Sequence, residues 1–546
     1  MSRLPEYHAA RWDEPIVLEM GRPGRRGTLV GDAEPELVAA VGDGAALVPE
    51  GVRRKTAPRL PELSEFEVQR HYNHLAQMTL GMMGVNLFGT CTMKYNARLN
   101  ENLAARPFLA EIHPGQDEET IQGVLEILHS FDQILRELSG MSQFVFQPGG
   151  GADAAYTHAC ITRAYFAARG ELGQRDEIIT TMLAHPCNPA TAAAAGFKLI
   201  TLPLEEDGYP SVEALQAAVS ERTAAIMVNN PDDMGVYNPN IKRWVEIVHE
   251  AGGLAFYDHA NFNGVMGRIR ARELGFDACM YMLHKTFGAP KGGGGPAVGA
   301  YGCSEALVPF LPRPLVRREE GGHFTLERDA PQSIGRVREF FGNVPVVVKA
   351  YAWARAMGAQ GIKDAADLSV IANNYMERRL LAIRGITKSE PHLTEPRLEM
   401  TRYSLEGVTR DTGINVFDVQ NRMVDFGVDA FWLSHEPWIV PEPFTPEPGE
   451  LWSKEDVDLW IDVLARVVQE AYDTPELVKT APHNQAIHQV DGSGVNDPQR
   501  WATTWRAAVK KDVVPGGVRG ESAPRGLDLL SETSPEAPSR GEAGAS

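Results

Sequence analysis

The sequence predicts an α/β fold built on a mostly parallel β-sheet, with a smaller α+β domain after it. Between residues 143 and 301, short apolar runs alternate with longer amphipathic patterns, as strands joined by crossover helices do. A glycine turn, Pro148-Gly-Gly-Gly-Ala152, joins one of these strands to a helix. Several polar residues directly follow predicted strands, which is where open α/β sheets bind ligands.

The composition is that of a large globular protein. The 546 residues are 43% hydrophobic and 23% charged, and this length predicts more than one domain. The net charge of −19 disfavours a nucleic-acid partner, because phosphate binding requires a basic surface. No apolar run of about 18 residues could cross a membrane, and the first residues lack the pattern of a secretory signal, so a cytoplasmic location is expected. The five cysteines show no pairing or histidine spacing that indicates a disulfide framework or a metal site.

Four parts are predicted along the chain. Residues 1–64 are rich in Pro, Gly and Arg and predict an N-terminal arm, of a kind that often belongs to oligomers. Residues 65–343 contain the alternating strands and helices and predict a large binding domain. Residues 344–512 predict the smaller domain, which begins with a helix over 346–357. Residues 513–546 are rich in Pro, Gly, Ser, Ala and Glu and predict a disordered tail.

The elements of the large domain follow from the spacing of apolar residues. A helix is expected over 64–82, and apolar residues spaced by three and four predict an amphipathic helix over 118–138. Strands are expected over 143–146, 178–182, 198–202, 224–228, 254–257, 278–282 and 297–301, and further helices over 152–169, 211–218 and 241–251.

The glycine turn predicts an anion site. A strand, a glycine turn and a helix N-terminus bring unpaired backbone N–H groups and the positive end of the helix dipole to one point. We therefore expect Gly150, Gly151 and Ala152 to bind a phosphate group.

The glycine spacing alone leaves a dinucleotide site open. Gly149, Gly151 and Ala154 match G-x-G-x-x-A, and the acidic residues Glu171 and Asp176 lie about twenty residues later. Residues further along the chain have to separate the two interpretations.

Lys285 and Asp258 favour a different cofactor. Lys285 follows a short apolar strand, and partial burial there favours the neutral amine that condenses with an aldehyde. Asp258 ends the preceding strand, where a carboxylate suits the pyridinium nitrogen of pyridoxal phosphate (PLP). Many PLP enzymes of the aspartate-aminotransferase fold have this order of Asp and Lys. A nicotinamide site needs neither residue, so the pair favours PLP.

Further motifs occur in one order along the chain. They are Thr90-Cys-Thr-Met-Lys-Tyr-Asn96, Ala184-His-Pro-Cys-Asn-Pro-Ala190, Asp258-His-Ala-Asn261, His284-Lys-Thr-Phe287, Gly292-Gly-Gly-Gly-Pro296 and Ser333-Ile-Gly-Arg-Val337. With these motifs in register from about residue 15 to about residue 506, the chain resembles the glycine dehydrogenase (decarboxylating) P-protein, in particular its separate PLP-bearing subunit 2.

The resemblance implies a PLP enzyme of fold type I in the glycine cleavage system. Such an enzyme decarboxylates glycine and transfers the aminomethyl group to the lipoyl cofactor of H-protein, which is thereby reduced. The resemblance also implies a lysine-less P-protein subunit 1 as partner and an oligomer, either a hetero-oligomer or a homodimer. It assigns the catalytic roles to Lys285, His185 and Asp258.

The resemblance also implies a set of binding residues and no metal. The cofactor contacts would be Gly150, Gly151, Ala152, His185, Asn188, Asn230, Asp258, Ala260, His284 and Lys285. Lys94 and Thr92 suit a carboxylate or phosphate of the substrate or cofactor. Arg336 suits either a substrate carboxylate or a structural ion pair.

Several positions close to the expected site depart from the usual P-protein pattern. His259 replaces a glycine, the stretch with Ala154 and Ala155 lacks the usual acidic residue, and Pro186-Cys187 replaces Gly-Thr. Asn229 replaces a threonine, Lys291 a histidine and Val85-Asn86-Leu87 the usual Phe-Tyr-Pro. Larger groups in a tight pocket change substrate fit more readily than fold. A divergent PLP-dependent decarboxylase, aminotransferase or oxidase acting on another amino acid is therefore the alternative. A non-catalytic partner or a dinucleotide-binding protein is the third hypothesis.

Overall fold

The computed structural model describes residues 4–5, 7–22, 24–25, 27, 31–42, 44–55, 61–79, 85–87, 97–205, 208–289, 297–428, 433 and 439–489. These residues fall into two compact units. One lies within Met1–Glu6 and Met83–Ala481, and the other within Tyr7–Met82 and Pro482–Ser546. No helix in the described ranges has the length and apolar character needed to cross a membrane.

The larger unit is built on a seven-stranded sheet with the order β1-β7-β6-β5-β4-β2-β3. The strands are β1 (Gln143–Val145), β2 (Glu177–Thr181), β3 (Lys198–Leu202), β4 (Thr223–Asn229), β5 (Leu254–His259), β6 (Ala278–Met282) and β7 (Gly299–Cys303). Only β7 runs antiparallel to its neighbours, β1 and β6, and the other pairs are parallel. The expectation of a mostly parallel sheet is thus confirmed.

The last strand of the sheet starts later than the sequence predicts. A strand over 297–301 was expected, whereas β7 begins at Gly299. The N–H groups of Ala297 and Gly299 donate instead to the carbonyls of Gly149 (3.2 Å) and Pro148 (2.8 Å). The start of this segment therefore holds the glycine turn through hydrogen bonds before the chain continues as β7.

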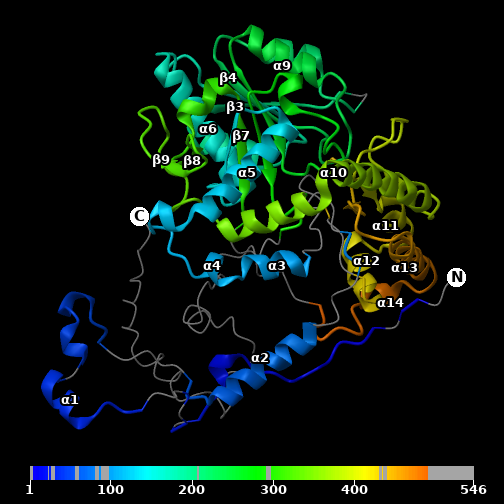
Figure 1. Ribbon diagram of the computed structural model, residues 1–546. Helices are drawn as coiled ribbons and strands as arrows, with labels where there is room; N and C mark the ends of the chain where they lie inside the picture. The colour runs from blue at the N-terminus through cyan, green and yellow to red at the C-terminus, as the bar shows by residue number, and fades with distance from the viewer. Residues whose placement is uncertain are drawn as a thin grey trace, which may run out of the picture. The chain divides into compact units, whose positions relative to one another are not determined.

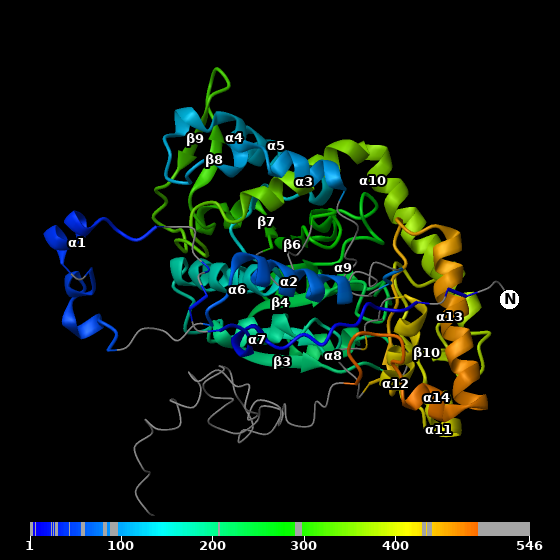
Figure 2. The same cartoon turned by 90° about the horizontal axis from the view of Figure 1, so that it is seen from below.

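Helices cover both faces of the sheet (Figures 1 and 2). They are α5 (Gln122–Ser139), α6 (Gly151–Ala168), α7 (Cys187–Ala194), α8 (Val212–Ala218), α9 (Ile241–Glu250) and the first part of α10 (Val344–Leu380). In β5, Ala255 and Tyr257 pack in the core that contains residues of α5, α9 and α10, whereas Phe256 packs in the core of α6 and α7. Burial on both faces explains why the strands are continuously apolar.

Shorter elements complete this part of the larger unit. They are the helices α3 (Arg98–Ala104) and α4 (Pro107–Ala110), the hairpin β8 (Leu315–Arg318) and β9 (Phe324–Glu327), and the 3₁₀ turns η5 (Glu118–Thr120), η6 (Ala271–Leu274) and η7 (Glu305–Phe310). Part of the helix expected over 118–138 is therefore the turn η5, and α5 starts at Gln122.

Helix α10 is much longer than the expected helix over 346–357. It bends at Gly358, whose φ of 64° is rare for residues with a side chain, and continues to Leu380. Its last turns enter a second core with α11 (Glu406–Thr412), α12 (Val416–Met423), η8 (Val424–Phe426), α13 (Lys454–Asp473), α14 (Pro475–Lys479) and the small sheet β10 (Thr387–Lys388), β11 (Tyr403–Ser404) and β12 (Pro443–Phe444).

The smaller unit contains α1 (Pro35–Val41), α2 (Glu65–Thr79) and the 3₁₀ turns η1 (Val17–Glu19), η2 (Gly44–Leu47) and η3 (Glu50–Val52). The carboxylate of Glu14 contacts Nδ1 of His71 at 2.6 Å and also contacts His74 on α2. Trp12 stacks on His74 with 3.9 Å between ring centres. These contacts fix the N-terminal segment to α2.

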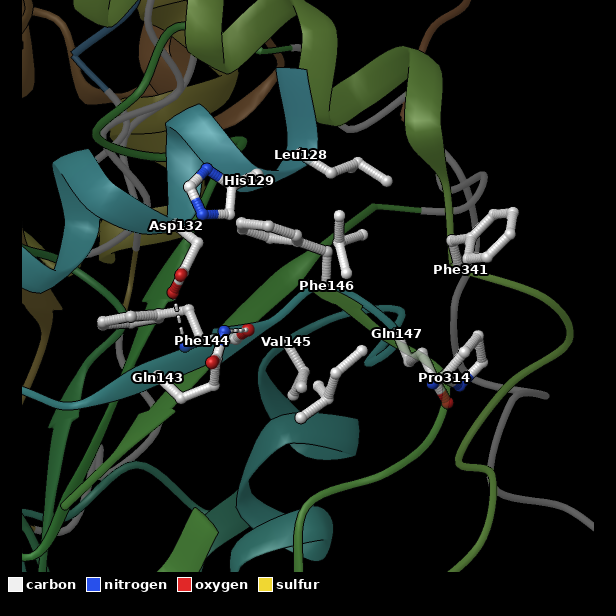
Figure 3. Close-up of a pocket in the computed structure, with 12 residues that line it drawn as sticks. Leu128, His129, Asp132, Gln143, Phe144, Val145, Phe146, Gln147, Pro314 and Phe341 are labelled. Carbon is white, nitrogen blue, oxygen red and sulfur yellow. Dashed lines mark hydrogen bonds between the residues drawn. The ribbon is translucent and has the colours of Figure 1, made fainter. Parts of the chain in front are cut away.

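A buried carboxyl group joins α5 to the edge strand β1 (Figure 3). Asp132 is 4% exposed, and its Oδ1 accepts the N–H of Phe144 at 2.7 Å. It borders a pocket whose lining also includes His129 and Gln143. Burial raises the pKa of Asp132 to about 6, although the Phe144 N–H and Arg136 favour the charged form.

We expect Asp132→Asn to remove a pH dependence of stability. The folded pKa of about 6 exceeds the unfolded value of 3.8, so the native state favours the protonated acid and loses stability as the pH rises through 6. The loss is at most about 3 kcal/mol. Asn keeps the acceptor for Phe144 but carries no charge. Melting temperatures between pH 4.5 and 7 should therefore fall more for the wild type than for Asp132→Asn. Parallel curves for the two proteins would contradict this account.

Candidate active site

The carboxyl ends of three neighbouring strands meet at one edge of the sheet. In the parallel register, Asn229 at the end of β4 lies beside Asp258, and Asp258 lies beside Met280 of β6. The N–H of Lys285 donates to the carbonyl of Met282, the last residue of β6, at 3.0 Å. The sheet therefore brings Asp258 and Lys285 to the same edge.

These residues line one pocket. Its lining consists of His185, Asn229, Pro231, Asp233, Asp258, Ala260, Asn261, Lys285, Glu399 and Met400. Lys285 is 9% exposed and Asp258 is 4% exposed. Both charged groups are thus largely removed from water, which strengthens every electrostatic interaction between them.

Both oxygens of Asp258 accept hydrogen bonds. Oδ2 accepts from Nδ2 of Asn188 on α7 at 3.0 Å, and Oδ1 accepts from the N–H of Ala260 at 2.9 Å. Burial raises the pKa of Asp258, whereas His185, the Ala260 N–H, Lys285 and Asn188 all favour its charged form. The carboxyl group is thereby held in one orientation with positive groups close by.

Local hydrogen bonds position the loops around the pocket. Nδ1 of His185 accepts the N–H of Cys187 at 3.1 Å, which fixes the half-buried imidazole at the start of α7. Oγ1 of Thr286 accepts the N–H of Phe262 at 3.0 Å and so joins the loop after Lys285 to the loop after Asp258. His284 is 7% exposed beside Lys285.

The predicted anion site lies at the same edge of the sheet. Strand β1 is antiparallel to β7, which is antiparallel to β6, so β1 and β6 end at the same edge. Gly150 is the N-cap of the 18-residue helix α6, and Gly151 and Ala152 form its first turn. A side chain at Gly299 would lie 2.5 Å from the carbonyl oxygen of Gly150, so the turn needs glycine in the adjacent strand. The N–H groups in the first turn of a helix have no partner within the helix, which is why such a turn suits an anion.

The structure places Asn230 and Arg336 outside the lining of this pocket. The side chain of Asn230 donates to the carbonyl of Asn238 and accepts its N–H, so it braces a loop, and Asn229 lines the pocket instead. Arg336 is exposed and borders a separate pocket with Arg313 and Arg328. Lys94 and Thr92 lie outside the described residues.

Three of the departures from the usual P-protein pattern lie behind the pocket, whereas Asn229 lines it. Ala154 and Ala155 are fully buried in the core of α6, and His259 is fully buried on the face opposite Asp258. The His259 ring lies 3.5 Å from that of Tyr257, and burial lowers its pKa to about 3. None of these three side chains is part of the pocket lining.

Glu399 is a pocket residue that the sequence did not reveal. It is fully buried, and neither carboxyl oxygen has a well-formed hydrogen bond within the described ranges. Burial, and then the charge of Glu447, raise its pKa to about 8, while the backbone N–H groups of Glu399 and Gly264 and the charge of Lys285 oppose the shift. Glu399 lies in an irregular segment between β10 and β11, where no periodic or motif signal marks it.

The residues at this edge fit PLP. The pocket offers an amine at Lys285 for the aldehyde, a fixed carboxylate at Asp258 for the pyridine nitrogen and an imidazole at His185. The N-terminus of α6 offers backbone donors for the phosphate. A dinucleotide site would leave the buried Asp258 and Lys285 without a function.

Comparison with known proteins agrees with this assignment. Residues 145–428 match the family model of class-V aminotransferases. The probable glycine dehydrogenase (decarboxylating) subunit 2 of Pyrococcus abyssi is 43% identical over 487 residues, 89% of this chain and 95% of the relative. The protein of the same description from Bacillus velezensis is 38% identical over 480 residues, 88% of this chain and 95% of the relative.

Two solved structures share the fold. A glycine decarboxylase (P-protein) of the glycine cleavage system, in inhibitor-bound form, has a TM-score of 0.65 at 22% identity and covers 80% of this chain and 100% of its own. The cysteine desulfurase CsdA from Escherichia coli has a TM-score of 0.53 at 17% identity, over 71% of this chain and 95% of its own. The expected PLP-dependent fold type I is confirmed. The chain therefore belongs to the glycine dehydrogenase (decarboxylating) subunit 2 family of PLP-dependent enzymes.

Proposed function

We propose that this chain decarboxylates glycine with PLP and passes the aminomethyl group to the lipoyl cofactor of H-protein. The observation that carries the proposal is the single pocket that joins Lys285, Asp258 and His185, in a chain 43% identical to glycine dehydrogenase subunit 2. The burial of His259, Ala154 and Ala155 supports the same substrate, because these departures do not narrow the pocket.

The residues of this chain would have distinct roles. Lys285 would hold the cofactor covalently, Asp258 would keep its ring nitrogen protonated, and His185 would lie against its ring. The first turn of α6 would bind the phosphate, and Asn188 and Ala260 would orient Asp258. When bound, PLP supplies an aldehyde for amines and a ring that accepts electrons.

The substrate carboxylate requires a partner from elsewhere. Among the described residues that line the pocket there is no arginine. We propose Lys94 and Thr92 for this role, with Arg336 as a further candidate. Arg336 would have to act from its own pocket, for example in a neighbouring subunit of the oligomer.

We further propose that the chain works with a lysine-less P-protein subunit 1 in the cytoplasm. The subunit number in the relatives' description implies a subunit 1. Lipoyl H-protein would be the third partner, because it carries the disulfide that accepts the aminomethyl group.

Borohydride reduction of the PLP-loaded protein should attach the cofactor to Lys285. The buried position of Lys285 in the pocket with Asp258 makes it the expected point of attachment. Peptide mapping by mass spectrometry identifies the modified residue, and Lys285→Arg should abolish the label. A label on Lys94 or Lys291 would refute the assignment.

Asp258→Asn should retain PLP but lose most turnover. Asn keeps the size of the side chain and removes the charge that stabilises a protonated ring nitrogen. We expect a fall in turnover of roughly 10²–10³, as for loss of a fixed charge-stabilising group. PLP absorbance checks occupancy and carbon dioxide release checks turnover. Near-normal turnover would show that another group protonates the ring.

Glycine should be the substrate of the assembled system. With subunit 1 and lipoyl H-protein present, the chain should exchange labelled bicarbonate into the carboxyl group of glycine. The Cα–carboxylate bond must be held in a defined orientation, so a pocket shaped for another amino acid would lose rate. Absence of exchange, together with turnover of another amino acid, would favour a divergent decarboxylase, aminotransferase or oxidase.

A further inference from the structure

The C-terminal part of the larger unit brings an acid into the pocket. Glu399 lines the pocket with Lys285, Asp258 and Asp233, and it is fully buried. Neither carboxyl oxygen has a hydrogen bond of good geometry in the described part of the chain, although the N–H groups of Glu399 and Gly264 lie close enough to oppose the rise in its pKa. An ionised carboxylate in such surroundings is costly, and the usual response is to bind a proton.

The backbone around Glu399 is shaped for this side chain. A Cβ added at Gly264 would overlap the Glu399 carboxyl group. A larger residue at position 264 would therefore displace the Glu399 side chain. The N–H of Leu398 donates to the carbonyl of Gly235 at 3.3 Å, and Nδ2 of Asn373 donates to the carbonyl of Leu398 at 3.0 Å. The carboxyl group is thus held in the pocket by its neighbours.

A second carboxylate next to Glu399 further favours its neutral form. Both oxygens of Glu447 accept from Nδ2 of Asn261, at 3.1 and 3.0 Å, and Asn261 lines the pocket. Two neighbouring buried carboxyl groups do not readily carry two charges, so one keeps a proton. Glu447 has the amide donor, which leaves the proton to Glu399. The charged or titratable groups around the pair are Lys285, Asp258, Asp233, His185 and Glu450.

The proposed reaction takes up one proton in each turnover. When glycine loses carbon dioxide, the electron pair of the broken C–C bond stays at the α-carbon. The carbon forms a C–S bond with one sulfur of the lipoyl disulfide, the S–S bond breaks, and the other sulfur leaves with an electron pair as a thiolate. That thiolate becomes a thiol only by binding a proton. The disulfide is reduced and the glycine carbon is oxidised, so no further oxidant is needed.

We propose that Glu399 is the proton donor of the pocket: it is a carboxylic acid in the resting protein and gives up one proton in each turnover. This inference rests on the proposed function and names a group for one step of it. Two other pocket residues are less suited, because Asp258 has both oxygens engaged and Nδ1 of His185 accepts the N–H of Cys187. Asp233 is the competing donor, since its Oδ2 is buried without a partner in the described residues.

Infrared spectroscopy tests the resting state without any turnover. In the full-length PLP-loaded protein, the C=O stretch of a protonated carboxylic acid should be present at pH 7 and disappear as the pH rises through about 8. Glu399→Gln should lack this band. Asp233→Asn should retain it. Glu450→Gln is the matched control. It removes a half-buried carboxyl group that accepts a hydrogen bond from Asn263 but does not line the pocket. A band that persists in Glu399→Gln would overturn the proposal.

The pH profile of net aminomethyl transfer tests the function of that proton. With subunit 1 and H-protein, thiol formation by the wild type should fall above about pH 8, where Glu399 loses its proton. Glu399→Gln should lower the rate by a factor of roughly 10²–10⁴, as loss of a general acid does. The rate of this variant should no longer decrease above about pH 8. Glu399→Asp should keep the fall at a reduced rate. A wild-type rate in Glu399→Gln, or loss of the alkaline fall in Asp233→Asn instead, would overturn the proposal. If the wild type fails to use glycine at all, the proposed function fails while the infrared result still stands.

Discussion

The site depends on the parallel direction of strands β4, β5 and β6. Parallel neighbours end at the same edge, so Asp258 and Lys285 meet although a full crossover separates them in the chain. The register matters as much as the direction. Asp258 and His259 point to opposite faces of the sheet, and a slip of one residue would bury the carboxylate in the aromatic core around Tyr257.

Burial alone does not decide the charge of a carboxyl group in this protein. Asp258 and Glu399 are both buried in one pocket, yet Asp258 has two hydrogen-bond donors with positive groups near it, whereas Glu399 has a second carboxylate near it. The donors favour an ionised Asp258, and the neighbouring charge favours a protonated Glu399. Burial nevertheless raises the pKa of both groups, and the charge of Glu447 raises that of Glu399 further.

The sequence predicted the regular part of the fold well and the irregular part poorly. Two apolar strands, one with Asp258 near its end and one followed closely by Lys285, mark the sheet edge, because burial on both faces makes such runs conspicuous. Glu399 and Asp233 lie in irregular segments, where side-chain direction depends on long-range contacts and follows no period. Position alone also did not distinguish Asn230, whose side chain bonds the backbone of Asn238, from Asn229, which lines the pocket. The division at residues 64, 343 and 512 and the roles of the site residues stay predictions.

The pocket combines a general frame with a more specific lining. The sheet that carries Asp258 and Lys285 has a counterpart in a cysteine desulfurase at only 17% identity, so this frame does not by itself select a reaction. The class-V match ends at residue 428, before Glu447 and Glu450. These two residues reach back to the loop after Asp258 through hydrogen bonds from Asn261 and Asn263. The segment after residue 428 thus places the charge of Glu447 next to Glu399. This segment is where a common fold can acquire a particular chemistry.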